Sequence, residues 1–167
     1  NGAIGQAKKD LQLTADRLNQ VLQESVQGQA FCSVNKAVVT QSSAAIPVVP
    51  LYIAILFKIM REHQVHEDCI EQMHRLFKDY LYSDQPGTLD ENRCIRLDDK
   101  EMTDDIQAAV AEAWQQVNTD NLSAHADLPA YREGFLRLFG FEVDGVDYSQ
   151  DLDPAVAIPS IQATEAV

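Results

Sequence analysis

Several patterns that identify common protein classes are missing from this sequence of 167 residues. The longest apolar run, residues 44–57, has 14 residues and two prolines, whereas a membrane-spanning helix needs about 20 apolar residues. There is no Gly-rich phosphate loop of the GxGxxG or GxxxxGK type, and no GxSxG nucleophile elbow. These absences argue against a spanning helix and an α/β-hydrolase site. If a nucleotide is used, its phosphate-binding turn lies outside these residues.

Cysteine is scarce as well, because Cys32, Cys69 and Cys94 are far apart and form no CxxC pair. An odd number of widely spaced cysteines favours free thiols and a reducing, cytoplasmic compartment. The stretch "HQVHEDCIEQMH" places three histidines around Cys69, at steps that resemble zinc-ligand spacing. A structural zinc site needs four ligands that converge on one ion, whereas this set spans a helix break. We therefore expect no metal site, and a zinc-supported domain is the least favoured alternative.

Basic side chains are few in the second half of the chain. Residues 1–82 hold 8 basic and 8 acidic side chains, whereas residues 83–167 hold 5 and 18, which accounts for the whole net charge of −13. Such an acidic surface repels nucleic acid and anionic lipid, because both need a dense cationic footprint. We expect no nucleic-acid or membrane partner. An acidic protein partner would have to avoid the second half.

What the sequence does contain is helical periodicity, most clearly near its start. Apolar residues recur at three- and four-residue steps and predict one helix over about residues 3–25, with a stripe made of Ile4, Ala7, Leu11, Ala15, Leu18 and Leu22. At about 100° per residue, Lys8 projects within this stripe and faces the protein body, whereas Lys9 faces water. Geometry alone leaves two roles open for Lys8: a stem that snorkels along apolar surface, or a functional ammonium.

The segment after Gly28 predicts a short strand and a polar turn. "AFCSV" (residues 30–34) reads as a strand without an obvious partner, although "RCIRL" (residues 93–97) is a candidate brief strand. The polar residues 40–43 then interrupt apolar flanks. A capped turn is the simpler interpretation of this polar island. The alternative is a surface of backbone N–H and C=O groups plus a hydroxyl that suits a flat amide such as nicotinamide.

Four further helices are predicted, over about residues 50–63, over about residues 67–82, after Asp98, and from Asp127 to Gly140. Asp98 and Glu101 stand at capping-box spacing, and Leu97 and Met102 are placed as a hydrophobic staple. The stretch "LDDKEMTDD" is therefore interpreted as a solvated acidic helix cap. The turn formers of residues 83–92 predict a loop, and the acidic tail 143–160 is expected to wrap the surface.

Five sequence blocks together point to one family: "GAIGQAKKDL", "SVNKAVVTQSSAAIPVVPLYIAILFKIM", "HEDCIEQMHRLF", "RLDDKEMTDDIQAAV" and "FLRLFGFEVDGVDY". In this order they closely resemble the C-terminal part of the FabV-type trans-2-enoyl-acyl-carrier-protein reductases, also called trans-2-enoyl-CoA reductases. The resemblance runs from Gly2 to about Pro154. It implies an α/β fold, namely the C-terminal part of a Rossmann-type, short-chain-dehydrogenase-like fold. This segment would be mostly helical, with two or three short strands.

The resemblance also implies where the rest of the enzyme lies. Residues 1–167 would be a single C-terminal segment of a larger one-domain reductase. The dinucleotide phosphate loop, the catalytic tyrosine and the partners of the strand at residues 30–34 are then expected upstream of Asn1. In the family that tyrosine precedes the lysine with eight residues between them, and only seven residues stand before Lys8 here.

The same resemblance assigns roles to residues of this chain. Lys8 is implied to bind the nicotinamide ribose and to lower the pKa of the upstream tyrosine, since a nearby ammonium favours a phenolate. The implied cofactor is NAD, as NADH. The stretch implied to hold its nicotinamide amide comprises Ala37, Val38, Val39 and Thr40. The helix entered at residues 47–52 would line the acyl pocket.

The function implied is NADH-dependent reduction of the trans-2 double bond of enoyl thioesters in fatty acid synthesis, by a cytoplasmic monomer. The substrate would be an acyl-carrier-protein or CoA thioester, and the isolated segment would be inactive. The alternative is a non-enzymatic helical module that binds a carrier protein or an acyl chain. Because acyl carrier protein is acidic, its expected docking residues are basic: Lys9, Arg17, Lys36, Lys58, Arg61, Arg75 or Lys78.

Overall fold

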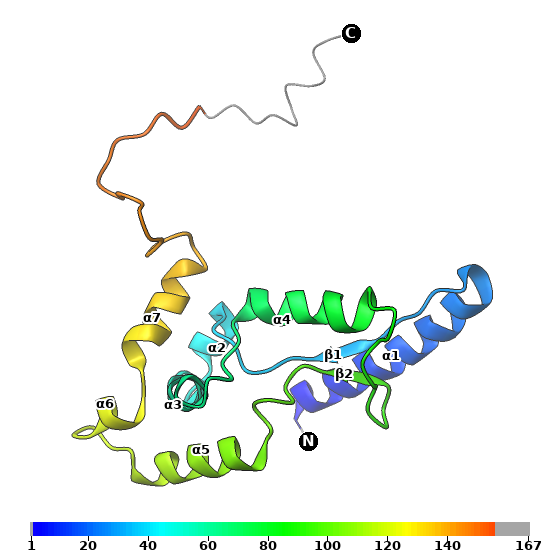
Figure 1. The fold of residues 1–167 in the computed structure, drawn as a ribbon, viewed down its shortest axis with the longest axis horizontal. Helices are drawn as coiled ribbons and strands as arrows, with labels where there is room; N and C mark the ends of the chain where they lie inside the picture. The colour runs from blue at the N-terminus through cyan, green and yellow to red at the C-terminus, as the bar shows by residue number, and fades with distance from the viewer. Residues whose placement is uncertain (1, 156–167) are drawn as a thin grey trace.

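The computed structural model describes residues 2–155 and has a mainly helical architecture with one small sheet (Figure 1). The elements follow one another as α1 (Ala3–Val26), β1 (Cys32–Val34), α2 (Gln41–Ala45), α3 (Val49–Glu62), α4 (Cys69–Arg75), η1 (Leu76–Leu81), β2 (Cys94–Arg96), α5 (Asp104–Gln116), α6 (Leu122–His125) and α7 (Leu128–Arg137). The predicted helices over about 3–25 and 50–63 are confirmed to within about one residue at each end.

Helix α3 is the centre of the hydrophobic core. Figure 1 looks nearly along α3, and α5, α7 and α2 lie around it. Residues 53–57 of this helix are apolar and buried without a break, and its charged residues Lys58, Arg61 and Glu62 follow only in the last turns. The fully buried side chains include Ile53, Ile55, Leu56 and Met60, and Ile106 and Val110 of α5 pack against them.

The sheet consists of β1 and β2, which pair in parallel with Cys32 opposite Cys94. The sequence offered no obvious partner for the first strand and placed its partners upstream. The structure corrects this, because "RCIRL" supplies one partner from within the chain. The pairing continues past the strands, where the Leu97 N–H donates to the Val34 carbonyl at 2.8 Å.

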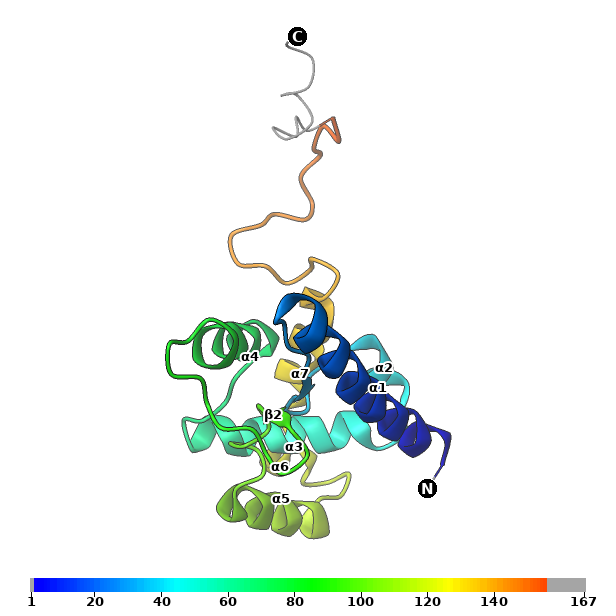
Figure 2. The same cartoon turned by 90° about the vertical axis from the view of Figure 1, so that its right-hand side faces the viewer.

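Helix α1 lies beside the strands in both ribbon views (Figures 1 and 2). Gln12 attaches it to the β2 side, since its Nε2 donates to the Asn92 carbonyl and its Oε1 accepts from the Cys94 thiol, both at 2.9 Å. The predicted apolar stripe is present, but it is largely exposed within residues 2–155. Ile4 is 70% exposed and Leu11 63%.

The predicted helix over residues 67–82 is divided into two elements. Asp68 and Glu71 form a capping box at the start of α4, with both hydrogen bonds 2.8 Å long. After Arg75 the backbone widens into the π-helix η1, which ends with the Tyr82 N–H donating to the Phe77 carbonyl at 2.8 Å. A π-helical turn interrupts the 3.6-residue period that the prediction assumed.

The predicted capping box at Asp98 and Glu101 is wrong. Helix α5 begins six residues later than Asp98, with Thr103 as its N-cap residue. Both carboxylates are buried rather than solvated, and each has a partner outside α5. The hydrophobic staple is wrong as well, because Leu97 is buried whereas Met102 is 53% exposed.

The last helix begins as predicted. The Asp127 carboxylate caps α7 by accepting from the Ala130 N–H at 3.0 Å, and the chain leaves the helix before Gly140, whose φ is +79°. The expectation that the acidic tail wraps the surface is wrong for its described part. Residues 143–155 are exposed and extend away from the helices (Figure 1), and residues 156–160 lie outside the described range.

None of the helices among residues 2–155 is both long enough and apolar enough to cross a membrane.

Candidate functional site

The connection between β1 and α2 is the segment in which four of the five predicted site residues lie. We call residues 35–40 the β1–α2 strap. Buried side chains fix its first half at two neighbouring N–H groups. The Lys36 N–H donates to Oε1 of Gln72 at 3.0 Å, and the Ala37 N–H donates to Oε2 of Glu101 at 2.7 Å.

The second half of the strap is fixed by a capping box at Thr40. Its hydroxyl accepts from the Ser43 N–H at 3.0 Å, and its own N–H donates to the Ser43 hydroxyl at 2.8 Å. The interpretation of the polar island as a capped turn is therefore confirmed. Thr40 is exposed, so the cap leaves its side chain accessible.

Between these anchored halves lie Val38 and Val39, which have a different environment. Among the described residues, no hydrogen bond is recorded to either N–H group. Both residues line an open cavity of about 470 Å³ between the strap, α3, α4 and α7. Other residues on its wall are Phe57, His66, Ile70 and Gly134. The centre of the strap is thus held in place at both ends, and the N–H groups of Val38 and Val39 remain able to donate hydrogen bonds.

Lys36 is a buried cation of the strap, with only 2% of its surface exposed. Its Nζ donates to the Ala37 carbonyl at 3.0 Å and lies 4.1 Å from the centroid of the Phe57 ring. Burial lowers the pKa of Lys36 to about 8, and the nearby charges of Glu101 and Glu67 oppose that shift. Sequence reasoning had placed Lys36 among exposed docking residues, and the structure corrects this.

His66 also contacts the Phe57 ring, with ring centroids 4.5 Å apart in an edge-to-face arrangement. Burial, together with the positive charge of Lys36, lowers the pKa of His66 to about 4. The imidazole is therefore neutral at pH 7. The Phe57 ring thus contacts both the Lys36 ammonium and the neutral His66 imidazole, and Lys36 itself belongs to the strap.

Glu101 connects the strap to the first turns of α3. While Oε2 accepts from the strap, Oε1 accepts from the Tyr52 hydroxyl at 2.7 Å. Burial and this hydrogen bond raise the pKa of Tyr52 to about 12, so the phenol is protonated at pH 7.

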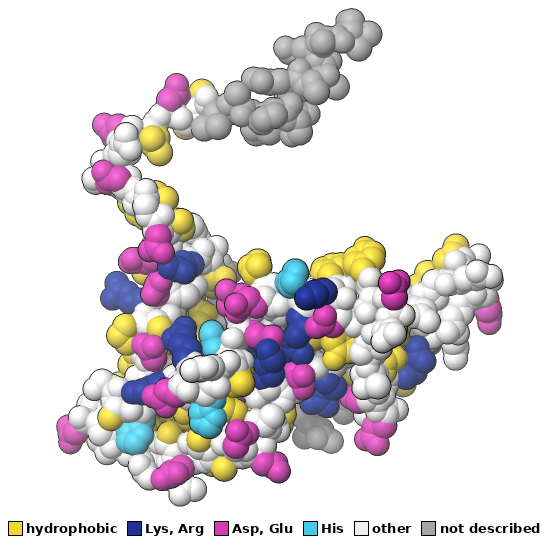
Figure 3. Space-filling view, viewed as in Figure 1, with side chains coloured by type: hydrophobic (Ala, Val, Ile, Leu, Met, Phe, Trp, Pro, Cys, Tyr) yellow, Lys and Arg dark blue, Asp and Glu magenta, His cyan; other side chains and the backbone are white. Residues whose placement is uncertain are grey.

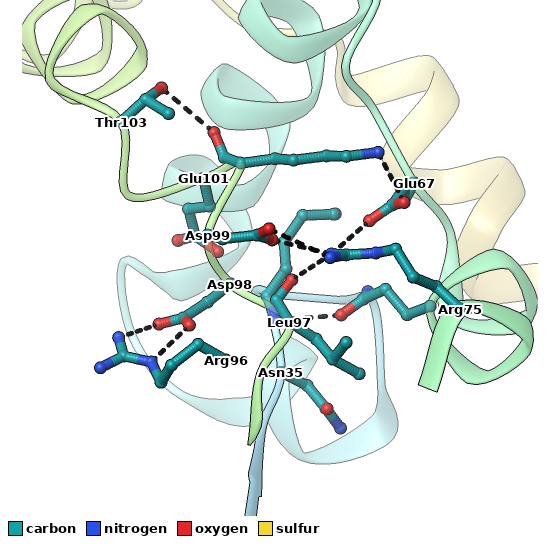
Figure 4. A network of polar contacts seen from close by, with 12 residues as sticks. Asn35, Glu67, Arg75, Arg96, Leu97, Asp98, Asp99, Glu101 and Thr103 are labelled. Atoms are coloured by element: carbon teal, nitrogen blue, oxygen red, sulfur yellow. Dashed lines mark hydrogen bonds and ion pairs between the residues drawn. The ribbon is translucent and has the colours of Figure 1, made fainter. Parts of the chain in front are cut away.

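The turn that carries Glu101 is joined to neighbouring elements by a network of charged residues shown in Figure 4. Arg75 of α4 donates to Glu67, to Asp99 and to the Leu97 carbonyl at 2.9, 2.8 and 2.8 Å. Lys100 donates to the other oxygen of Glu67 at 2.6 Å. Arg96, the last residue of β2, forms a two-pronged pair with Asp98, at 2.7 and 2.6 Å. This network ties the turn before α5 to α4.

Lys8, the remaining predicted site residue, lies on α1 and is exposed. The expectation that it faces the protein body is not met by the described residues. No hydrogen bond or ion pair within residues 2–155 joins it to the strap. The structure therefore brings Ala37, Val38, Val39 and Thr40 together and leaves Lys8 apart from them.

The residues that sequence reasoning missed are the buried polar ones: Lys36, Gln72 and Glu101. Gln72 and Glu101 were hidden because each stands where a helix or helix cap explains a polar residue. The one available signal was the polar pair Asn35–Lys36, which interrupts the apolar residues of 34–39. Within residues 2–155 no group of three or more His, Cys, Asp or Glu side chains could hold a metal ion.

Comparison with known sequences places this architecture among the enoyl reductases. Residues 1–82 match the trans-2-enoyl-CoA reductase catalytic region, and residues 89–152 match the enoyl reductase FAD binding domain. The chain is 52% identical over 164 residues to an enoyl-[acyl-carrier-protein] reductase [NADH] of Coxiella burnetii, covering 98% of this chain and 40% of that protein. It is 48% identical over 151 residues to a trans-2-enoyl-CoA reductase [NADH] of Brachyspira hyodysenteriae, covering 90% and 38%.

Solved structures agree. The trans-2-enoyl-CoA reductase of Clostridium acetobutulicum in complex with NAD matches with a TM-score of 0.87 and 44% identity, over 92% of this chain and 40% of that one. The enzyme of Treponema denticola in complex with NAD matches with a TM-score of 0.83 and 45% identity, over 90% and 37%.

The fold is therefore a partial α/β fold of the type found in nicotinamide-dependent reductases, as predicted. The chain belongs to the trans-2-enoyl-CoA reductase family. It spans about two fifths of the length of the curated relatives that it matches.

The name of the second matched domain mentions FAD, and the described residues do not fit that cofactor. The sequence of 89–152 contains no Gly-rich phosphate loop. Its most prominent arginines, Arg96 and Arg137, are already paired with carboxylates at 2.6 Å, Asp98 and Glu133 respectively. Arg93 and Arg132 are exposed and form no ion pair among the described residues, but no phosphate-binding turn accompanies them, so no step of the chemistry is assigned to a flavin.

Proposed function

We propose that this chain is the C-terminal segment of a one-domain NADH-dependent reductase that acts on the trans-2 double bond of enoyl thioesters in fatty acid synthesis. Membership of the family and the names of relatives near 50% identity support this proposal. NADH, when bound, supplies the hydride to the β-carbon of the thioester. The contribution of this chain is to bind and orient that cofactor and to close the acyl site.

The strap is the observation that carries the proposal. Its central N–H groups, at Val38 and Val39, have no recorded partner among the described residues, while Lys36, Gln72 and Glu101 hold the backbone on one side. Accessible backbone donors and acceptors beside the Thr40 hydroxyl suit a planar carboxamide. Ala37, Val38, Val39 and Thr40 would hold the nicotinamide amide, and a fixed backbone would lower the entropy cost of orienting it.

Lys8 is proposed as the catalytic cation. Its exposed ammonium is available to a ribose hydroxyl and to a tyrosine from a preceding segment. A lysine ammonium near a phenol lowers the phenol pKa, which prepares that tyrosine to stabilise the enolate oxygen. The residues at 47–52, at the start of α3, would line the acyl pocket.

The substrate is proposed to be an acyl-carrier-protein or CoA thioester, and the enzyme a cytoplasmic monomer. The free cysteines of the described residues support the reducing compartment. A carrier would dock on basic residues of the first half. Figure 3 shows basic and acidic side chains interspersed on one face and acidic ones along the tail. Lys36 is removed from the docking set because it is buried, and Arg75 because it is engaged with Glu67 and Asp99. Lys58 donates to the Ser123 and Ala124 carbonyls and Arg61 pairs with Asp127, so both are also engaged. The exposed members without an ion pair among the described residues are Lys9, Arg17 and Lys78.

The test is NADH oxidation by the full-length protein with crotonyl-CoA. Lys8→Ala is expected to reduce turnover by about 10²-fold or more, because it removes charge stabilisation from the reacting centre. Arg132→Ala, which removes an exposed cation of α7 outside the proposed docking residues, is the control and should retain turnover. Wild-type rates in a folded Lys8→Ala protein would contradict the role of Lys8. Absence of turnover in the wild type would contradict the reductase.

The alternative function is a helical module that binds a carrier protein or an acyl chain without catalysis. The exposed apolar side chains of α1 and α4, such as Leu18 and Ile70, are the observation that favours it. This alternative predicts binding of an acyl carrier with no NADH affinity. Fluorescence titration of NADH with the full-length protein separates the two functions, since saturable binding excludes the module.

A further inference from the structure

Glu101 is a buried carboxylate to which the reductase proposal gives no role of its own. Only 6% of its surface is exposed, and its two oxygens accept from groups 64 and 49 residues away in sequence. Burying a carboxylate is unfavourable unless its charge and lone pairs are satisfied. Here Ala37 and Tyr52 satisfy the lone pairs, and the ammonium of Lys36 lies close enough to act on its charge.

The two partners of Glu101 belong to the two parts of the proposed active site. Ala37 opens the stretch that would hold the nicotinamide amide. Tyr52 stands at the end of the stretch that would line the acyl pocket. Among the described residues, Glu101 is the side chain whose hydrogen bonds join these two stretches.

The position of Glu101 is fixed independently of both partners. Its backbone carbonyl accepts from Nε2 of Gln107 at 2.8 Å, and the Met102 N–H closes a turn onto the Asp98 carbonyl at 2.9 Å. The ion pairs Arg75–Asp99 and Lys100–Glu67 join the same turn to α4 and the residue that precedes its cap (Figure 4). Because this turn is constrained, the Glu101 carboxylate can fix the positions of the two groups that it binds, the Ala37 N–H and the Tyr52 hydroxyl.

We propose that Glu101 is a positioning residue that sets the β1–α2 strap in register with the first turns of α3, so that the nicotinamide and the enoyl thioester are held in one productive geometry. This inference rests on the proposed reductase function. It assigns Glu101 no contact with either substrate. Its effect passes through the Ala37 backbone on the cofactor side and through Tyr52 on the acyl side.

The first test compares Glu101→Ala with Glu101→Gln in the full-length protein. Glu101→Ala should weaken NADH binding and reduce kcat, with a combined loss in kcat/KM of about 10- to 100-fold, because small misplacements of reacting groups are costly. Glu101→Gln should recover most of the loss. Its Oε1 can still accept from Ala37, and its Nε2 can donate to the Tyr52 oxygen. Equal impairment of both variants would overturn a geometric role.

The second test separates the effect on the cofactor side, at the strap, from the effect on the acyl side, at the start of α3. Gln72→Ala removes the neighbouring strap contact at Lys36 and should raise the Kd of NADH while leaving the KM for crotonyl-CoA at saturating NADH. Tyr52→Phe removes the hydroxyl on the α3 side and should lower kcat or raise the KM for crotonyl-CoA, with the Kd of NADH unchanged. These two variants also decide the matter if Glu101→Ala does not fold. Wild-type constants in both would overturn the inference.

Val110→Ala is the matched control for general loss of stability, because Val110 is buried in α5 and lies in the core cluster around α3. It should lower the Tm and leave the Kd of NADH and the KM unchanged. The activity of the wild type distinguishes a failure of the proposed reductase function from a failure of the positioning role alone. An inactive wild type that binds no NADH refutes the proposed function and this inference with it. An active wild type beside an unimpaired, folded Glu101→Ala refutes only the positioning role.

Discussion

The charge of Lys36 should make stability depend on pH in a direction opposite to that of an ordinary salt-bridged lysine. The perturbation is Lys36→Met, which keeps most of the side-chain volume and removes the ammonium. In the folded protein that ammonium is buried against the Phe57 ring and one carbonyl. Its pKa is lowered from 10.5 to about 8, mainly because burial disfavours the charged form.

The size and sign of the effect follow from that shift. A change of about 2.5 pKa units corresponds to about 3 kcal/mol, at 1.36 kcal/mol per unit. Below pH 8 both the folded and the unfolded chain hold the proton, so the whole cost of burying the charge is present. Between pH 8 and 10.5 the unfolded chain binds more protons than the folded one, and the stability of the wild type rises with pH. The methionine variant lacks this rise.

The assay is urea unfolding of the full-length wild type and Lys36→Met at several pH values from 7 to 10.5. At pH 7 we expect the variant to be the more stable protein, by about 1–3 kcal/mol, because it no longer buries a charge. The lower end of this range allows for the hydrogen bond and the cation–π contact that the variant also loses. The difference should then fall by about 3 kcal/mol as the pH rises to 10.5. Groups common to both proteins, including Tyr52, cancel in the difference. A difference that stays constant over this range would refute the buried, charged lysine.

Two other predictions concern the core and the strap. Ile55→Ala should destabilise the full-length protein by about 2–5 kcal/mol, because Ile55 is fully buried in α3; a loss below about 1 kcal/mol in denaturant unfolding would show that α3 is not the core. Thr40→Ala should cost about 1 kcal/mol by removing the side-chain cap of α2 and should raise the KM of NADH, whereas Thr40→Ser keeps the cap. An alanine variant with the NADH affinity of the wild type would separate the cap from cofactor binding.

The helices that could be predicted are those whose signals are local. The core helix α3 follows from a long apolar run, and α7 follows from the Asp127 cap. The division between α4 and η1 could not be read in the same way, because a π-helical turn changes the helical period without a distinctive residue. The five-residue α2 is set by one capping box, at the polar island that the sequence presented as a turn.

The candidate site shows where local reasoning fails. Asp98 and Glu101 have the spacing of a capping box, and the same spacing forms a real one at Asp68 and Glu71. The difference lies in the partners. Arg96 draws Asp98 away, and Ala37 offers Glu101 a donor from 64 residues earlier in the chain. Spacing identifies a carboxylate that could cap a helix, but only the tertiary fold decides which N–H group it meets.

Two groups of residues depart from the usual rule that apolar side chains are buried and charged ones are exposed. Ile4 and Leu11 of α1 are exposed, although their periodicity is that of a core-facing stripe, whereas Lys36 and Glu101 are buried although charged. Apolar burial alone explains neither observation. An exposed apolar stripe beside Lys8 is a surface available for covering by further polypeptide, and relatives of this family are about two and a half times as long. The buried charges depend on contacts within the described residues. They can therefore hold the strap in shape independently of what covers α1, and the effect of Glu101→Ala on NADH binding should persist even where α1 is altered.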